Sequence, residues 1–242
     1  MSYYGGYAPY ICVAERREKA KKKIEKLRKK DPNISPVIIT GTKLATTWWG
    51  NSWNKNLESY SDYSNRIERG RSYVRNCAVL DLKITPGCIE ALVQGSETKP
   101  YKVSVSIKPL IKGVWEEITK ECSGKIDSLQ ELVEGNFPKA LSEFFTVKGK
   151  GLFPAPKEIN LECSCPDYAN MCKHVAAVLY GVGARLDENP ALFFMLRNVD
   201  VEELISETIS KKSKTMLEKS KTKSKRVIKE TDISDMFGID LD

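Results

Sequence analysis

The chain has 242 residues, of which 41% are apolar, and this is enough to bury a core in one large domain or two modest ones. Its start, MSYYGGYAPYICVAERREK, has no basic segment followed by an apolar one, and no long uncharged apolar run occurs, so neither secretion nor membrane insertion is predicted. We therefore expect a cytoplasmic protein in a reducing compartment, where clustered cysteines are metal ligands or catalytic thiols before they are disulfides.

The net charge of +7 is spread unevenly along the chain. Residues 15–31 hold ten Lys and Arg against four acids, and residues 211–229 hold nine against one. The last thirteen residues, ETDISDMFGIDLD, hold five acids and no base. The rest of the chain is nearly neutral, so the basic character belongs to two segments, which we call the basic arms.

The first predicted region, residues 1–45, is an N-terminal arm with one charged helix. Its apolar positions form only a thin stripe, and they are Ala20, Ile24 and Leu27. The motif DPNISP then ends the helix. A second helical stretch begins near Trp48 and carries aromatic and apolar residues at spacings of three or four, namely Trp49, Trp53, Leu57 and Tyr60. We interpret this stripe as a core face, with a base-stacking platform as the alternative.

Three runs of alternating apolar residues follow, and they are the clearest β signal in the chain. They cover residues 78–84, 89–93 and 101–107, with the turn TPG between the first two. These runs predict an antiparallel three-stranded meander. Helical material follows in SLQELVEGNFPKALSEFFTV, so residues 46–157 are predicted to form an α+β domain.

The segment CSCPDYANMCKH, residues 163–174, holds three of the seven cysteines and the only histidine. Cys163 and Cys165 follow a short candidate strand, KEINLE, and in extended backbone their side chains leave on the same side. Cys172 and His174 cannot face one point from a regular helix, because two helical residues turn by about 200°. We therefore predict Cys172 in the turn before a helix and His174 in its first turn. An apolar stripe supports that helix: Val175, Val178, Leu179 and Val182.

These four side chains form the ligand set of a closed tetrahedral zinc site with three thiolates and one imidazole. Zinc is favoured over softer or redox metals, although iron or cobalt could occupy the same ligands. A disulfide between Cys163 and Cys165 would close a strained ring and leave Cys172 unexplained. A catalytic thiol would need a free base, and the only histidine is already used. We expect one structural Zn²⁺ per chain.

The spacing C-x-C, six residues, C-x-H resembles the SWIM zinc finger, and blocks upstream of it are similar to the region that precedes the finger in stand-alone prokaryotic SWIM proteins. Those blocks are TTWWGNSW, RGRSYVRN, VLDLKI, EALVQGS and PYKV, and the resemblance spans residues 46–200. It implies a non-catalytic zinc module for binding DNA or protein. It also implies a partnership with a Snf-type helicase ATPase, or in other branches a role in transposases and recombination accessory factors.

The predicted organisation is therefore an α+β fold in which an antiparallel β-meander with helices is followed by a small zinc finger and C-terminal helices. The finger, a strand or knuckle plus a helix, and the helices after it cover residues 158–210. Residues 211–242 are predicted to be a basic, disordered tail with an acidic end, because Ser, Thr and Lys provide almost no surface to bury.

Candidate nucleic-acid contacts come from the basic residues. Arginines in RIERGRSYVR are the best folded candidates for a phosphate-facing edge, and they are Arg66, Arg69, Arg71 and Arg75. In the tail, the candidates are Lys221, Lys223, Lys225 and Arg226. Arginines that only face water, and a solvated tail without function, are the alternatives.

Two classes of function remain open from the sequence. The first is a zinc-stabilised protein that binds nucleic acid, DNA in the first instance, beside a helicase; such a protein would be associated with the nucleoid in a prokaryote. The second is a protein-interaction module with a structural zinc and no contact to nucleic acid. An enzyme ranks third, because the chain shows no Walker loop, no paired-carboxylate motif and no nucleophile with a spare histidine. No membrane or small-molecule substrate is indicated.

Overall fold

The computed structural model describes residues 12–60, 64–122, 129–136, 139–147 and 149–202, together with Ser206, Ser213 and Leu217. The described residues form an antiparallel sheet with helices, which confirms the α+β class. The elements are α1 (Val13–Arg28), α2 (Trp48–Glu58), α3 (Ser64–Arg75), β1 (Val79–Thr85), β2 (Cys88–Val93), β3 (Tyr101–Ile107), α4 (Lys112–Cys122), α5 (Leu129–Glu134), α6 (Lys139–Phe145), the 3₁₀ turn η1 (Pro156–Glu158), β4 (Ile159–Cys163), α7 (Lys173–Glu188) and α8 (Ala191–Leu196).

The sheet has four strands in the order β1-β2-β3-β4, and each neighbouring pair is antiparallel. The first three strands confirm the predicted meander. The candidate strand before the finger becomes β4, which returns after three helices and pairs with β3, so that Val103 faces Cys163 and Val105 faces Leu161. The sheet therefore continues across the domain boundary predicted between residues 157 and 158. The strand that brings the first thiol is anchored in the body of the protein.

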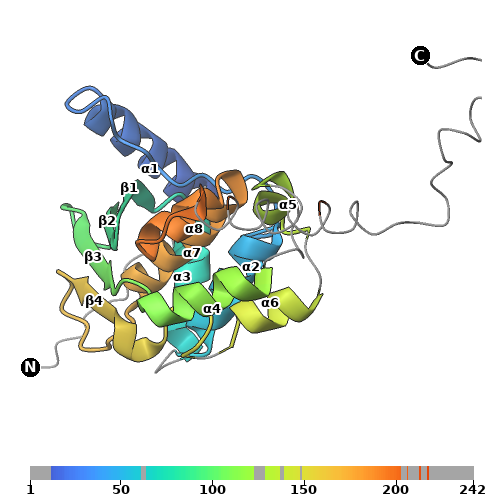
Figure 1. Cartoon of the computed structure of the whole chain (residues 1–242). Coiled ribbons are helices and arrows are strands. Elements are labelled where there is room, and N and C mark those ends of the chain that lie inside the picture. Colours follow the sequence, from blue (N-terminus) through green and yellow to red (C-terminus); the bar gives the residue numbers. More distant parts are fainter. Residues whose placement is uncertain are drawn as a thin grey trace, which may run out of the picture.

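Helix α7 is the central element of the helical layer that covers one side of the sheet (Figure 1). It packs against α3 and α2, and its predicted apolar stripe is buried. The contact with α3 is close at Gly70, where an added Cβ would lie 2.5 Å from the Cβ of Ala176. The absent side chain at Gly70 thus lets the two helices approach.

The aromatic stripe of α2 lies in the core, as predicted. Trp49 and Trp53 have no exposed surface, and each indole N–H has a backbone acceptor. Trp49 Nε1 donates to the Leu132 carbonyl over 2.9 Å, and Trp53 Nε1 donates to the Leu179 carbonyl over 2.8 Å. Because buried indoles with paired N–H groups are inaccessible to bases, the base-stacking alternative is wrong for these two residues.

The start of α2 is tied to the end of α7 by one carboxylate. Asp187 accepts hydrogen bonds from the backbone N–H and the hydroxyl of both Thr46 and Thr47. Thr47 is also the N-cap of α2, and its hydroxyl accepts from the N–H of Gly50. The TTWWGNSW block therefore has a structural explanation: it caps a helix and fixes that helix to α7.

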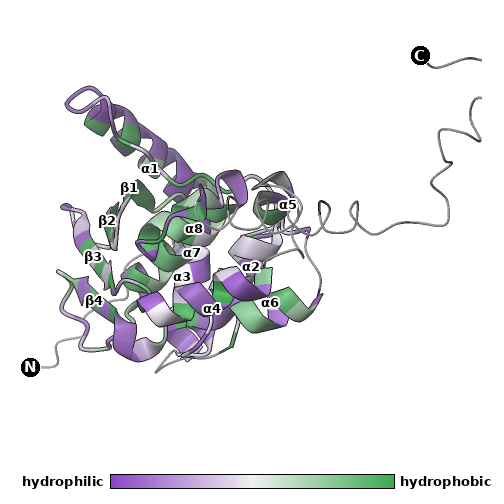
Figure 2. Ribbon diagram, viewed as in Figure 1, coloured by the Kyte–Doolittle hydropathy of each residue, from purple (hydrophilic) through white to green (hydrophobic). Residues whose placement is uncertain are grey.

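Helix α1 confirms the predicted charged helix and touches the body along a narrow stripe. Ala20 and Ile24 pack with Cys77 and Leu80, and most of the remaining surface is exposed. In Figure 1 α1 projects away from the sheet, and in Figure 2 it is mostly hydrophilic, in contrast to the apolar α7. The helix therefore displays eight Lys and Arg against three Glu.

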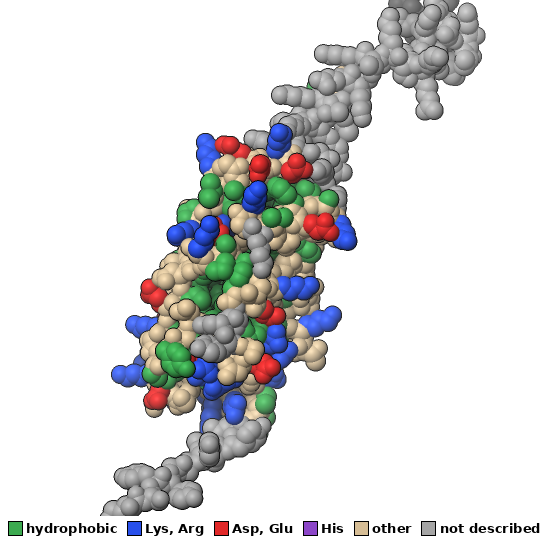
Figure 3. Space-filling model, turned by 90° about the horizontal axis from the view of Figure 1, so that it is seen from below, with side chains coloured by type: hydrophobic (Ala, Val, Ile, Leu, Met, Phe, Trp, Pro, Cys, Tyr) green, Lys and Arg blue, Asp and Glu red, His purple; other side chains and the backbone are tan. Residues whose placement is uncertain are grey.

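The surface is mixed in character. On the face shown in Figure 3, hydrophobic side chains gather in the middle, and Lys and Arg side chains are spread around the margin, interspersed with Asp and Glu. Among the helices of the described residues, none combines the length and the apolar character that a membrane span needs.

Candidate metal centre

Two elements bring the four candidate ligands together. Cys163 ends β4, and Cys165 follows in a knuckle that is fixed to β3, because Ser164 exchanges hydrogen bonds with the backbone of Lys102. Cys172 is the N-cap of α7 and His174 lies in its first turn, as the sequence predicts. The six-residue loop between the two pairs folds the knuckle over the start of the helix.

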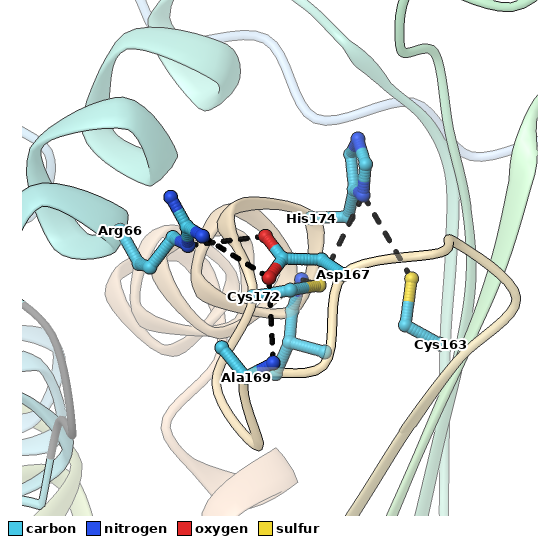
Figure 4. Close-up of polar contacts among 7 residues, drawn as sticks. Arg66, Cys163, Asp167, Ala169, Cys172 and His174 are labelled. Atoms are coloured by element: carbon cyan, nitrogen blue, oxygen red, sulfur yellow. Dashed lines mark hydrogen bonds and ion pairs between the residues drawn. The ribbon is translucent and has the colours of Figure 1, made fainter.

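The four donor atoms lie within 4.8 Å of one another. His174 Nδ1 is 3.8 Å from the Cys163 Sγ and 3.9 Å from the Cys172 Sγ. Figure 4 shows this nitrogen directed at both sulfurs and the other ring nitrogen directed away. A tetrahedron with Zn–S bonds of about 2.3 Å has edges of about 3.8 Å, so the observed spacing fits one zinc ion. The described residues contain one such cluster of ligating side chains.

Helix α7 and the neighbouring thiols favour a thiolate at Cys172. A hydrogen bond from Cys163 lowers the pKa of Cys172 to about 4, and contacts with the imidazole of His174 and the N–H of Val175 act in the same direction. The same shared proton, together with burial, raises the pKa of Cys163. Burial also raises the pKa of Cys165. The cluster therefore holds protons that a zinc ion would displace, since only thiolates bind zinc.

His174 is fixed in a closed aromatic setting. It is 1% exposed, and the rings of Tyr101 and Tyr73 lie 4.4 Å and 5.4 Å from it, centroid to centroid. Gly95 lies behind the ring, where an added Cβ would be 3.0 Å from Nε2. Nε2 has no hydrogen-bond partner among the described residues. Only Nδ1 faces the thiols, so the orientation of the ring assigns Nδ1 as the ligand atom.

An ion pair that the sequence did not predict holds the loop between the ligand pairs. Asp167 lies in this loop, and its carboxylate meets the guanidinium of Arg66 on α3 with contacts of 3.0 Å and 3.1 Å (Figure 4). The same carboxylate accepts from the N–H of Ala169. Both side chains of the pair are mostly buried. An acid between two ligand pairs was the available sequence signal, but its partner is 101 residues away.

The four predicted phosphate-facing arginines have different surroundings. Arg66 lies against Asp167, and Arg71 pairs with Glu58 over 2.7 Å and donates to the Tyr180 hydroxyl. Arg75 is exposed and donates to the Thr42 carbonyl. Arg69 is exposed and makes no ion pair with a described residue. Lys221, Lys223, Lys225 and Arg226 lie outside the described residues.

The Arg66–Asp167 contact gives a testable prediction. Arg66→Ala should weaken zinc binding by about 10- to 100-fold, because residues that orient a ligand loop contribute this much to metal affinity. Competition with a chromophoric chelator measures the affinity. Arg69→Ala removes the same charge one turn further along α3 and should leave zinc affinity unchanged. Equal zinc affinities of the Arg66→Ala and Arg69→Ala variants would contradict a role of the Arg66–Asp167 ion pair in holding the ligand loop.

The fold and the site together define a zinc-finger protein: a closed Cys₃His centre built on the edge of an antiparallel sheet and the start of a buried helix. Residues 145–182 match the family model described as the SWIM zinc finger, which confirms the resemblance seen in the ligand spacing. The matched range thus begins at the last residue of α6 and includes β4 and most of α7.

One relative extends the similarity beyond the finger. The uncharacterized protein Rv2102 of Mycobacterium tuberculosis (strain ATCC 25618 / H37Rv) is 35% identical to this chain over 164 residues. The alignment covers 67% of this chain and 59% of the relative, so this chain spans less than two thirds of that protein. No solved structure matches the chain.

Proposed function

We propose that this protein is a non-catalytic, cytoplasmic zinc protein that binds nucleic acid, DNA in the first instance, as an accessory of a Snf-type helicase ATPase. The observation that carries the proposal is that one folded body holds both a closed metal centre and a strongly basic helix, α1, which packs against β1. The first feature supports a structural zinc, and the second supports a polyanionic partner.

The donor set argues for a structural ion. Three sulfurs and one imidazole nitrogen supply all four positions of a tetrahedral zinc, so no position is left for an activated water or a substrate. When bound, zinc would link β4 to α7 and hold the loop between them. The four ligand residues therefore have a structural role, which is to position β4 relative to α7.

The charges of the basic arms support a nucleic-acid partner. Exposed Lys and Arg side chains gain affinity for phosphates through the release of counterions, without reading the base sequence. Helix α1, which contains most of the first basic arm, is mostly exposed and carries eight cations against three acids. A protein-interaction module would not need this charge, which is why we place that alternative second.

A salt titration of nucleic-acid binding tests the proposal. It also separates the contribution of the basic tail, residues 211–242, from that of the rest of the chain. If six tail cations meet phosphates, log K should fall against log salt with a slope of about −5, from roughly 0.9 per phosphate on duplex DNA. Cutting the chain after Ser210 should remove most of this slope. Any preference for a sequence or a structure should survive the cut, because it requires folded contacts.

The measurement uses duplex and single-stranded oligonucleotides with the full chain and the truncated chain. Equal slopes would assign the phosphate contacts to the body and leave the tail without this role. Absence of binding by the full chain at low salt would reject the nucleic-acid proposal and favour the protein-interaction alternative.

A further inference from the structure

Tyr168 is an exposed aromatic side chain in the loop between the two pairs of metal ligands. It is 85% exposed, and it makes no hydrogen bond, ring stacking or cation–π contact with a described residue. The other tyrosines that the structure describes are partly or fully buried, and they are Tyr60, Tyr73, Tyr101 and Tyr180. The ring of Tyr168 is therefore available to a partner from solution.

The residues on both sides of Tyr168 are fixed to the body of the protein. The carboxylate of Asp167 meets the guanidinium of Arg66 at 3.0 Å and 3.1 Å and accepts from the N–H of Ala169 over 3.3 Å (Figure 4). Ala169 is 8% exposed, and Met171 is 3% exposed. The ring thus stands on a stretch of backbone that is anchored before and after it. A partner that covers the ring would order little more than the side-chain torsions of Tyr168, so the entropic cost of binding is small.

The surroundings of Tyr168 suit a single flat ligand better than a protein surface. Among the described residues of the loop and of α3, no other large hydrophobic side chain is exposed. The centre of a protein–protein interface usually combines several apolar side chains. One exposed ring is sufficient to stack on one nucleic-acid base.

The charges of the loop and its neighbours also suit a nucleic acid. The acid of the loop, Asp167, is neutralised by Arg66. Arg69 follows Arg66 by one turn on the same face of α3, is exposed and makes no ion pair with a described residue. Lys173, the first residue of α7, adds a second positive charge at the end of the loop. A base that stacks on Tyr168 would therefore bring its phosphates to a surface without an unpaired acid in the loop.

The geometry points to Tyr168 as the residue that stacks on an unpaired base of a single-stranded nucleic acid. This inference rests on the proposed function and deepens it, because it names the form of nucleic acid and places a contact on the folded body. In a duplex, each base is covered by its neighbours, whereas a base of a single strand can present an open face to the ring. Because every base has such a face, Tyr168 should add affinity without reading the sequence.

Binding of single-stranded and duplex oligonucleotides of mixed sequence to the full, zinc-loaded chain tests the inference, with DNA and RNA strands as separate arms. Tyr168→Ala should weaken single-strand binding about 5- to 150-fold with an unchanged salt slope, because it removes stacking on one base and no charge. Duplex binding should stay the same. Tyr168→Phe keeps the ring and should bind single strands within about twofold of wild type. The matched control, Ile111→Ala, removes an exposed apolar side chain outside the loop and should bind like wild type.

A photochemical cross-link locates the contact directly. A single strand that carries iodouracil should, on irradiation, become attached to Tyr168 of the wild-type chain, and mass spectrometry of the peptides identifies the residue. Cross-links confined to other residues would overturn the inference.

Each variant is first shown to hold one zinc, so that lost binding is not a lost metal centre. A Tyr168→Ala chain that binds single strands as tightly as wild type would overturn the inference and leave the proposed function intact. An equal loss on duplexes and single strands would also overturn it, because the ring would then not stack on an unpaired base. A wild-type chain that binds no oligonucleotide at low salt rejects the proposed function itself, and the inference with it.

Discussion

Removing the zinc is expected to unfold the body of this protein and not only its finger loop. Cys172 caps α7, and α7 is the helix against which α2, α3 and the sheet pack. Apparent binding energies of structural zinc are about 10–16 kcal/mol, whereas whole domains are stable by about 5–15 kcal/mol. Loss of the ion should therefore remove a free energy comparable to the entire stability of the fold.

Far-ultraviolet circular dichroism and thermal melting, before and after a strong chelator, measure this effect. Cys172→Ser should behave like the chelated wild-type chain. Cys12→Ser changes an exposed cysteine outside the cluster and should melt like wild type. A chelated protein that keeps its helical signal and its melting temperature would show that packing alone sustains α7.

Trp53→Ala should lower the free energy of unfolding by about 3–5 kcal/mol, the usual cost of deleting a buried large aromatic side chain. Trp53 has no exposed surface, packs against Phe193 and donates to the Leu179 carbonyl in the middle of α7. The cavity would therefore open between α2 and the helix that begins at the metal centre.

Urea unfolding of the zinc-loaded chain measures the loss. Trp53→Phe serves as the graded control: it keeps a large ring, loses the N–H donor and should cost less than Trp53→Ala. In both variants, the salt slope of nucleic-acid binding should match wild type while the protein is folded. A Trp53 variant of wild-type stability that lost nucleic-acid binding would contradict the assignment of this residue to the core.

The parts of the site that could be predicted are those that depend on neighbouring residues. The spacing of Cys163, Cys165, Cys172 and His174 fixed the ligand set, because two-residue steps have different directions in a strand and at a helix start. The placement of Cys172 before α7 follows from the same rule. The alternation of apolar and polar residues also located β1, β2 and β3, because this pattern is complete within the few residues of each strand.

The parts that could not be predicted depend on contacts between distant segments. Asp187 meets Thr46 across 141 residues, and nothing in either short segment indicates the other. The pairing of β4 with β3 likewise follows from the path of the chain through three helices. Charge patterning has the same limit: Arg66 and Arg69 are three residues apart, yet the first is paired with Asp167 and the second is exposed.

The metal content of the intact chain tests the central claim most directly. Native mass spectrometry of the protein purified in the presence of zinc should show one zinc ion per wild-type chain and none held tightly by Cys163→Ser or His174→Ala. A wild-type chain without metal would contradict a structural zinc. A full equivalent of zinc, held at wild-type affinity by either variant, would contradict the Cys₃His ligand set on which the whole account depends.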